Sequence, residues 1–232
     1  MTRRYYGRRR RARSGMLALL LFLTTLLLVS CVAGSGVLWV KGLFGLDIAD
    51  YAAEPCEGTH DVKGKLANEL CEGISVLAGD SLTLQPFGGS AEAVAIYRDE
   101  ILDFMMRKSY ALYTGNGDLI KNAQEAYPHA LFTTVIPQKD FENTVYRYFG
   151  GNTVDHKSGA LYSYLDRADC YTTAGGTRES HVAIEPILIE ETANTYRMEF
   201  RLAKDGNTSE SYRAIFVKRQ DGAPYLKALE LI

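Results

Sequence analysis

Histidines are the first side chains in this sequence to consider for acid–base or metal chemistry. There are four of them, His60, His129, His156 and His181. No two have the short, regular spacing of metal ligands, and a single histidine on a strand or in a loop is usually exposed or hydrogen-bonded. Asp155 next to His156 could form half of a hydrolase dyad, but the sequence offers no nucleophile for it. We therefore predict no metal site.

Glutamates clustered on one predicted strand are the second candidates. Glu185, Glu190 and Glu191 could supply the pair of acids that glycoside hydrolysis requires. Such carboxylates more often form the solvated face of a strand. The sequence also contains no Gly-x-Ser-x-Gly, Walker or His-Glu-x-x-His motif. It therefore predicts no catalytic residue and no cofactor.

Tyrosines are concentrated in the part of the chain that is predicted to form a sheet. They are Tyr162, Tyr164, Tyr171, Tyr196, Tyr212 and Tyr225. If several point to the concave side of the sheet, they would line a pocket or a protein-binding groove. Because tyrosine also has a high strand propensity, the alternative is an ordinary half-buried sheet.

Cysteines allow a covalent link in the first part of the domain. Cys56 and Cys71 flank a short predicted helix, and in an oxidising compartment such a pair favours a disulfide. Closing a loop of about 15 residues would stabilise the fold by roughly 3 kcal/mol. Cys170 is then a buried thiol, or it replaces one partner of that bridge. Zinc is not predicted, because Cys31 falls in an apolar segment and no Cys-x-x-Cys spacing occurs.

An uncharged segment near the N-terminus determines the predicted location of everything that follows it. Residues 16–40 contain no ionisable acid or base. At about 1.5 Å per residue, this segment forms a helix long enough to cross a hydrocarbon core about 30 Å thick. Only a helix satisfies its own backbone hydrogen bonds in lipid. We therefore predict a single transmembrane helix, with the lipid bilayer as a partner.

The charge distribution gives this span its orientation. Residues 1–15 carry seven arginines and no acid, whereas residues 42–232 carry 18 bases and 28 acids, a net charge of −10. Bases beside a span keep that end in the cytoplasm. We therefore predict a basic cytoplasmic tail at 1–15 and an extracytoplasmic domain after the span. The acidic domain is not expected to bind nucleic acid.

Two other interpretations of the N-terminus stay open. Residues 28–31 read Leu-Val-Ser-Cys, which looks like a bacterial lipobox with Cys31 as the lipidated residue. A cleaved signal peptide is the second alternative. The apolar run continues to Val40 and includes Trp39 beside Lys41, which favours an uncleaved span. All three interpretations place residues 42–232 outside the cytoplasm.

In the remaining chain, the spacing of the apolar residues changes from a helical period to a strand period. Residues 41–89 are rich in glycine, and we predict a juxtamembrane linker with one short helix at 60–72. Helices are expected from Ser90 to about residue 113, at 118–127 and at 137–149. From residue 159 the period becomes two, and strands are expected at 162–164, 170–172, 181–191, 196–202, 211–218 and 225–232. Residues 90–232 are therefore an α+β domain in which helices cover an antiparallel sheet.

This order of elements resembles the NTF2-like, or cystatin-like, cone fold. The segments Val-Ile-Pro-Gln-Lys-Asp-Phe at 135–141, Tyr-Phe-Gly at 148–150 and Asp-Gly-Ala-Pro-Tyr-Leu at 221–226 are similar to membrane-anchored proteins of Firmicutes that we associate with that fold. The resemblance implies helices on a curved antiparallel sheet. It does not imply an activity, because the fold hosts enzymes, transport factors and assembly subunits.

Three functions remain compatible with these patterns. The first is a membrane-anchored extracytoplasmic domain that binds a protein partner or an envelope ligand without catalysis. The second is an enzyme of the cell envelope that uses the pocket of the cone. The third is a ligand-binding lipoprotein lipidated at Cys31.

Overall fold

The computed structural model describes residues 54–151, 154–175, 180–220 and 222–232. They belong to a compact unit that extends from Ala53 to Ile232. The basic tail, the apolar segment 16–40 and Cys31 lie outside the described residues. Within the described residues, no helix has the length and apolar character that a membrane span requires.

The main sheet is a curved antiparallel sheet of six strands. In spatial order they are β1 (Gly58–Thr59), β5 (Ala183–Glu191), β6 (Thr195–Lys204), β8 (Tyr212–Val217) and β9 (Tyr225–Leu231), with β7 (Asn207–Thr208) paired to β6. The register is irregular between Pro186 and Leu188 and between Ile215 and Phe216. Such irregularities bend a strand and increase its local twist. The predicted meander of long strands is therefore confirmed.

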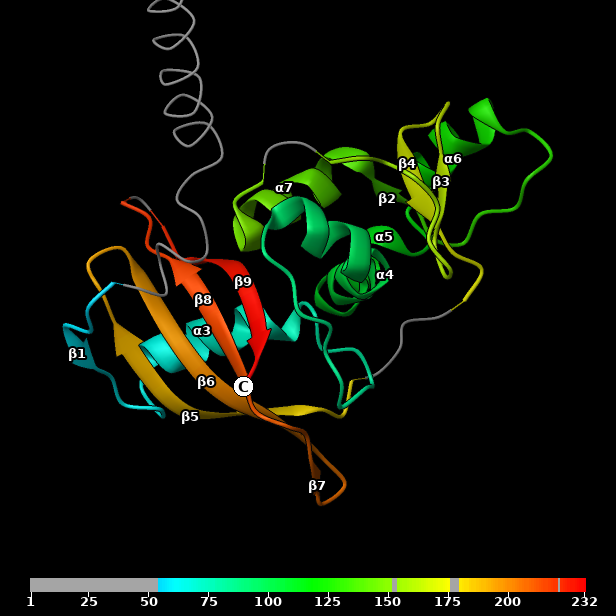
Figure 1. Cartoon of the computed structure of the whole chain (residues 1–232). Coiled ribbons are helices and arrows are strands. Elements are labelled where there is room, and N and C mark those ends of the chain that lie inside the picture. Colours follow the sequence, from blue (N-terminus) through cyan, green and yellow to red (C-terminus); the bar gives the residue numbers. More distant parts are fainter. Residues whose placement is uncertain (1–53, 152–153, 176–179, 221) are drawn as a thin grey trace, which may run out of the picture. The chain divides into compact units, whose positions relative to one another are not determined.

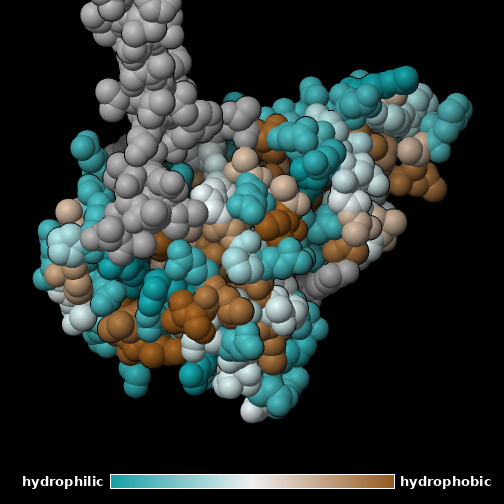
Figure 2. Space-filling model, in the orientation of Figure 1, coloured by the Kyte–Doolittle hydropathy of each residue, from teal (hydrophilic) through white to brown (hydrophobic). Residues whose placement is uncertain are grey.

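Strand β6 shows how the sequence determines the two faces of this sheet. Met198, Phe200 and Leu202 alternate along the strand and are completely buried, whereas Arg201 is exposed. Helix α3 (Lys65–Ser75) lies behind the sheet in Figure 1, on the buried face. The opposite face carries charged residues and some apolar ones, and Figure 2 shows hydrophobic areas between hydrophilic ones over these strands.

The strands between residues 163 and 172 belong to a second, smaller sheet and do not join the main one. This sheet has the order β2 (Ile136–Pro137), β4 (Cys170–Thr172) and β3 (Ser163–Leu165). The prediction that all the strands form one antiparallel sheet was wrong. Strand β2 immediately precedes a helix, and its pairing with β4 ties the small sheet to that helix, because the Gln138 amide donates to the Asp169 carbonyl (2.8 Å).

The other helices largely match the prediction. They are α4 (Ser90–Lys108), α5 (Tyr110–Tyr113), α6 (Gly117–Ala126) and α7 (Gln138–Phe149). Helices α4 and α7 contact each other and β9. The Asn116 side chain caps α6 and accepts from the Leu119 amide. Gly150 ends α7 in the left-handed conformation, directly after the predicted helix at 137–149.

The folded domain begins before the predicted boundary at residue 90. Leu70 and Ile74 of α3 are completely buried in the same core as α4 and the sheet. Strand β1 also pairs with the end of β5. The segment predicted as a juxtamembrane linker thus supplies a helix and an edge strand to the domain from residue 54 onward. Its helix begins at Lys65, five residues later than predicted.

One face of α4 carries charged residues, and two of them are buried. Arg98 is 5% exposed and Asp103 is 4% exposed. The chain before β3 packs over this face, where the Asp99 carboxylate accepts from the amides of Ala160 (2.8 Å) and Leu161 (2.9 Å). The Tyr162 hydroxyl donates to Asp103 (2.7 Å). The polar face of α4 is therefore an internal surface.

Candidate functional site

The six tyrosines that the sequence singled out do not come together. Tyr164 and Tyr171 belong to the small sheet, Tyr162 directly precedes it, and the other three lie on the main sheet. Tyr162, Tyr171 and Tyr212 are buried. The Tyr212 hydroxyl accepts from an amide of the chain before α4, that of Leu84 (3.0 Å). None of the six lines any of the three cavities described below.

A closed cluster forms around His156. A carboxylate accepts, so Nε2 of His156 donates to Glu142 Oε1 (3.0 Å), and Nδ1 forms a hydrogen bond with the Tyr171 hydroxyl (2.8 Å). The Tyr164 ring stacks on the imidazole at 5.3 Å, and the Phe141 ring meets it edge-on. The sequence had offered Asp155 as the acid partner. Instead, α7 supplies Glu142, because the chain after α7 folds back over that helix.

The His156 cluster acts as a structural contact between parts of the fold. Burial raises the pKa of Tyr171 to about 12, so its phenol stays protonated at neutral pH. A hydrogen bond from Gln138 and another from His156 hold the pKa of Glu142 below its ordinary value, against the opposing effect of burial. Both ring nitrogens of His156 have partners, and its side chain is 11% exposed. The cluster links α7, the chain after it and the small sheet.

The remaining candidate acids and bases are dispersed. Glu191 forms a hydrogen bond with His60 (2.7 Å) and an ion pair with Lys218 (2.6 Å), at the end of the main sheet where β1 begins. His129 and His181 are exposed and far from each other in sequence. In the described part of the chain, no three metal-binding side chains form a group. Glu185 and Glu190 lie on the charged face of β5 and do not form an acid pair with Glu191.

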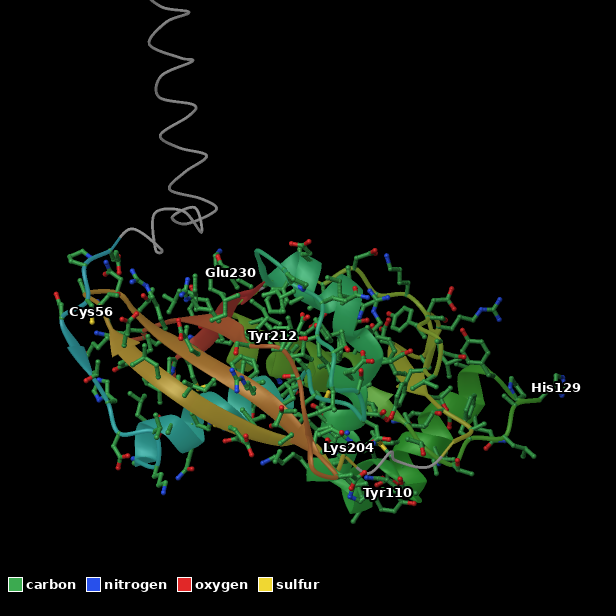
Figure 3. The ribbon with its side chains drawn as sticks, turned by 60° about the horizontal axis from the view of Figure 1, so that its bottom comes forward. Cys56, Tyr110, His129, Lys204, Tyr212 and Glu230 are labelled. Atoms are coloured by element: carbon green, nitrogen blue, oxygen red, sulfur yellow. The ribbon has the colours of Figure 1, made fainter. Side chains whose placement is uncertain are left out.

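The three described cysteines are free thiols, so the predicted bridge between Cys56 and Cys71 is not formed. Cys56 is exposed beside β1, at the end of the sheet in Figure 3, and its thiol donates to the Gly58 carbonyl (3.3 Å). Cys71 packs against the core, and burial raises its pKa. Cys170 is buried, as one alternative predicted, and its pKa is raised to about 11 by burial and by Asp169. Pairing of β1 with β5 directs Cys56 toward the sheet edge.

A cavity of about 300 Å³ lies between helices α3, α4 and α7. A second cavity of about 340 Å³ adjoins it and shares Phe104 and Lys108 with its lining. The lining of the first cavity includes Glu72, Phe104, Lys108, Ser109, Arg147 and Tyr148. We call the two cavities together the helical groove.

Charges and aromatic rings alternate along the helical groove. Lys108 donates to Glu72 Oε1 (3.1 Å) and lies over the Phe104 ring at 5.5 Å. The Arg147 guanidinium lies over the Tyr148 ring at 5.0 Å, and the Tyr148 hydroxyl donates to Glu72 (3.0 Å). Burial would raise the pKa of Glu72, but the bonds from Lys108 and Tyr148 outweigh it and lower the pKa. Two cations thus surround one carboxylate that is ionised at neutral pH.

Exposed apolar side chains continue from the groove onto α5. Tyr110 is 50% exposed and Leu112 is 49% exposed, and α5 follows directly after Ser109 of the groove wall. Figure 3 shows Tyr110 at the outer edge of the helical part of the domain. The sequence pattern did not predict this site, because α3, which forms one of its walls, lies in the glycine-rich segment that was interpreted as a linker.

Comparison of this chain with protein-family models, with curated proteins and with solved structures finds no match. The observed architecture is a mixed α+β fold with helices packed on a curved antiparallel sheet.

Proposed function

We propose that residues 54–232 are the extracytoplasmic domain of a single-span membrane protein with an NTF2-like fold. The uncharged segment 16–40 is its anchor, and the arginines of 1–15 keep the N-terminus in the cytoplasm. The order of helices before a curved antiparallel meander supports the resemblance to that fold. The distribution of charge supports the orientation.

We further propose that this domain acts by binding an acidic segment of a partner protein in the helical groove. One observation carries this proposal: in the helical groove Lys108 and Arg147 outnumber the single carboxylate, Glu72, and exposed Tyr110 and Leu112 border them, on a domain that is acidic overall. Tyrosine and arginine are enriched at protein interfaces, and opposite charges favour encounter. Both ring nitrogens of His156 already have hydrogen-bond partners within the fold, and this supports binding over catalysis.

The location of the domain is testable through the exposed thiol of Cys56. In intact cells treated briefly with a membrane-impermeant reductant, an impermeant maleimide should label the full-length chain at Cys56. The buried Cys170 and the half-buried Cys71 should react much more slowly. The Cys56→Ser variant is the control and should lose most of the signal. Labelling of Cys56 only after the cells are broken would refute the extracytoplasmic location.

Reversal of the groove charges should weaken the binding of an acidic peptide. We expect the affinity of the full-length chain for a fluorescent deca-glutamate peptide to fall at least tenfold in the Lys108→Glu/Arg147→Glu variant, which corresponds to about 1.4 kcal/mol. The affinity should also fall with added salt, because the screening length is about 8 Å at 0.15 M. Fluorescence anisotropy measures both effects.

The matched control changes the net charge equally at exposed lysines away from the groove. The Lys63→Glu/Lys121→Glu variant should bind the peptide within about twofold of the native affinity. This is expected if the peptide responds to the charges close to the groove and not to the net charge of the domain. Equal losses in both variants would exclude the groove. If a labelled hyaluronate oligosaccharide binds more tightly than the peptide, the proposed protein partner is wrong and an anionic glycan is the ligand of the groove.

A further inference from the structure

Arg98 is a buried cation without a carboxylate partner among the described residues. Its side chain extends from α4 and is 5% exposed. Nη2 donates to the Asp155 backbone carbonyl (2.8 Å), whereas the buried Nε has no hydrogen-bond partner. A guanidinium stays protonated in proteins, and a charge removed from water is costly unless it is paired. The native fold therefore leaves this charge only partly compensated.

A small cavity of about 160 Å³ lies beside Arg98. Ala91, Val94, Ala95 and Arg98 contribute to it from one face of α4, at the spacing i, i+3, i+4 and i+7. Helical side chains lean toward the N-terminus of their helix, so Arg98 extends toward the small residues of the preceding turns. These small side chains leave the space that the cavity occupies.

The second cation of the cavity is Lys157. Its ammonium pairs with the Asp155 carboxylate (3.2 Å), which is 81% exposed and therefore well solvated. The cavity also includes Ala91, in the first turn of α4, where the helix dipole is positive and no side chain caps the helix. The lining thus carries two cations, Arg98 and Lys157, against one carboxylate, Asp155, and it includes the start of the helix.

We propose that this cavity binds a small oxyanion group, a carboxylate or a phosphate, through the Arg98 guanidinium. The planar fork of arginine matches both groups, and an anion would pair the charge and offer an acceptor for Nε. The walls of alanine and valine limit the ligand to a small group or to the end of a chain. The site lies at the N-terminal half of α4, whereas the helical groove lies at its C-terminal end, so each proposal can fail independently.

The test is isothermal titration calorimetry of the full-length chain in detergent, with sodium phosphate and sodium acetate as separate probes against a chloride background. Saturable binding is expected and should weaken at least tenfold in Arg98→Gln. It should weaken less in Arg98→Lys, which keeps the charge and loses the fork. Tighter binding of acetate would assign the site to a carboxylate, and tighter binding of phosphate would assign it to a phosphorylated group.

The Ala95→Leu variant keeps the test decisive if Arg98→Gln does not fold. Ala95 is an exposed helical position, so leucine is compatible with folding, and it fills the cavity while Arg98 stays in place. This variant should also lose at least tenfold in affinity. The Lys65→Gln control removes a lysine that is 92% exposed and should bind as the native chain does. Absence of saturable binding, or unchanged binding in Ala95→Leu, would overturn the proposal.

Discussion

Replacement of Phe141 by alanine is expected to lower the free energy of unfolding by about 3–5 kcal/mol, the range for large core aromatics. Phe141 of α7 is completely buried. Its ring centroid lies 5.0 Å from that of Tyr171 and 6.1 Å from that of His156, so it joins α7 to the small sheet and to the His156 cluster. Truncation removes this packing and leaves a void that the surrounding rings cannot close.

Urea unfolding of the full-length chain, followed by near-ultraviolet circular dichroism, measures this cost. Phe141→Leu keeps most of the volume and should lose about 1.5 kcal/mol or less. Lys139→Ala changes an exposed side chain of the same helix and should stay within about 0.5 kcal/mol of the native value. A loss below about 1 kcal/mol in Phe141→Ala would show that the cluster around His156 does not depend on this ring.

Gly150→Ala should destabilise the fold by about 2–5 kcal/mol, from a left-handed backbone penalty of about 1–2 kcal/mol and an overpacking penalty of about 1–3 kcal/mol. Gly150 has φ +69°, and a Cβ placed there would lie 2.5 Å from Cε2 of Tyr225. The left-handed turn and the close approach of β9 both require glycine. Urea unfolding of the variant and of the native chain gives the difference.

Gly115 offers a matched control for the steric part of this effect. It has the same φ of +69°, but a Cβ there meets no atom within 4 Å. Gly115→Ala should therefore show only the backbone penalty of about 1–2 kcal/mol. In the double variant Gly150→Ala/Tyr225→Leu, the total loss should be smaller than the sum of the single losses. Equal losses at Gly150 and Gly115 would show that Tyr225 moves away at no cost.

The sequence by itself determined the elements whose cause is local. The alternation of Met198, Phe200 and Leu202 predicted the buried face of β6, because successive side chains of a strand point to opposite sides. Gly150 marked the end of α7, because a helix ends readily where a residue adopts the left-handed conformation. Such signals act within one turn or one strand. They also predicted the α+β class and the succession of the long strands along the chain.

Only the tertiary structure decided which distant segments pair. It separated β3 and β4 from the main sheet and paired His156 with Glu142. The partner of a strand or of a side chain depends on contacts between distant segments, and the local spacing of apolar residues does not determine these contacts. It also buried Arg98, because the chain after α7 covers a helix face that its residue types marked as solvent-exposed. The helical groove and the Arg98 cavity both arise from this long-range packing.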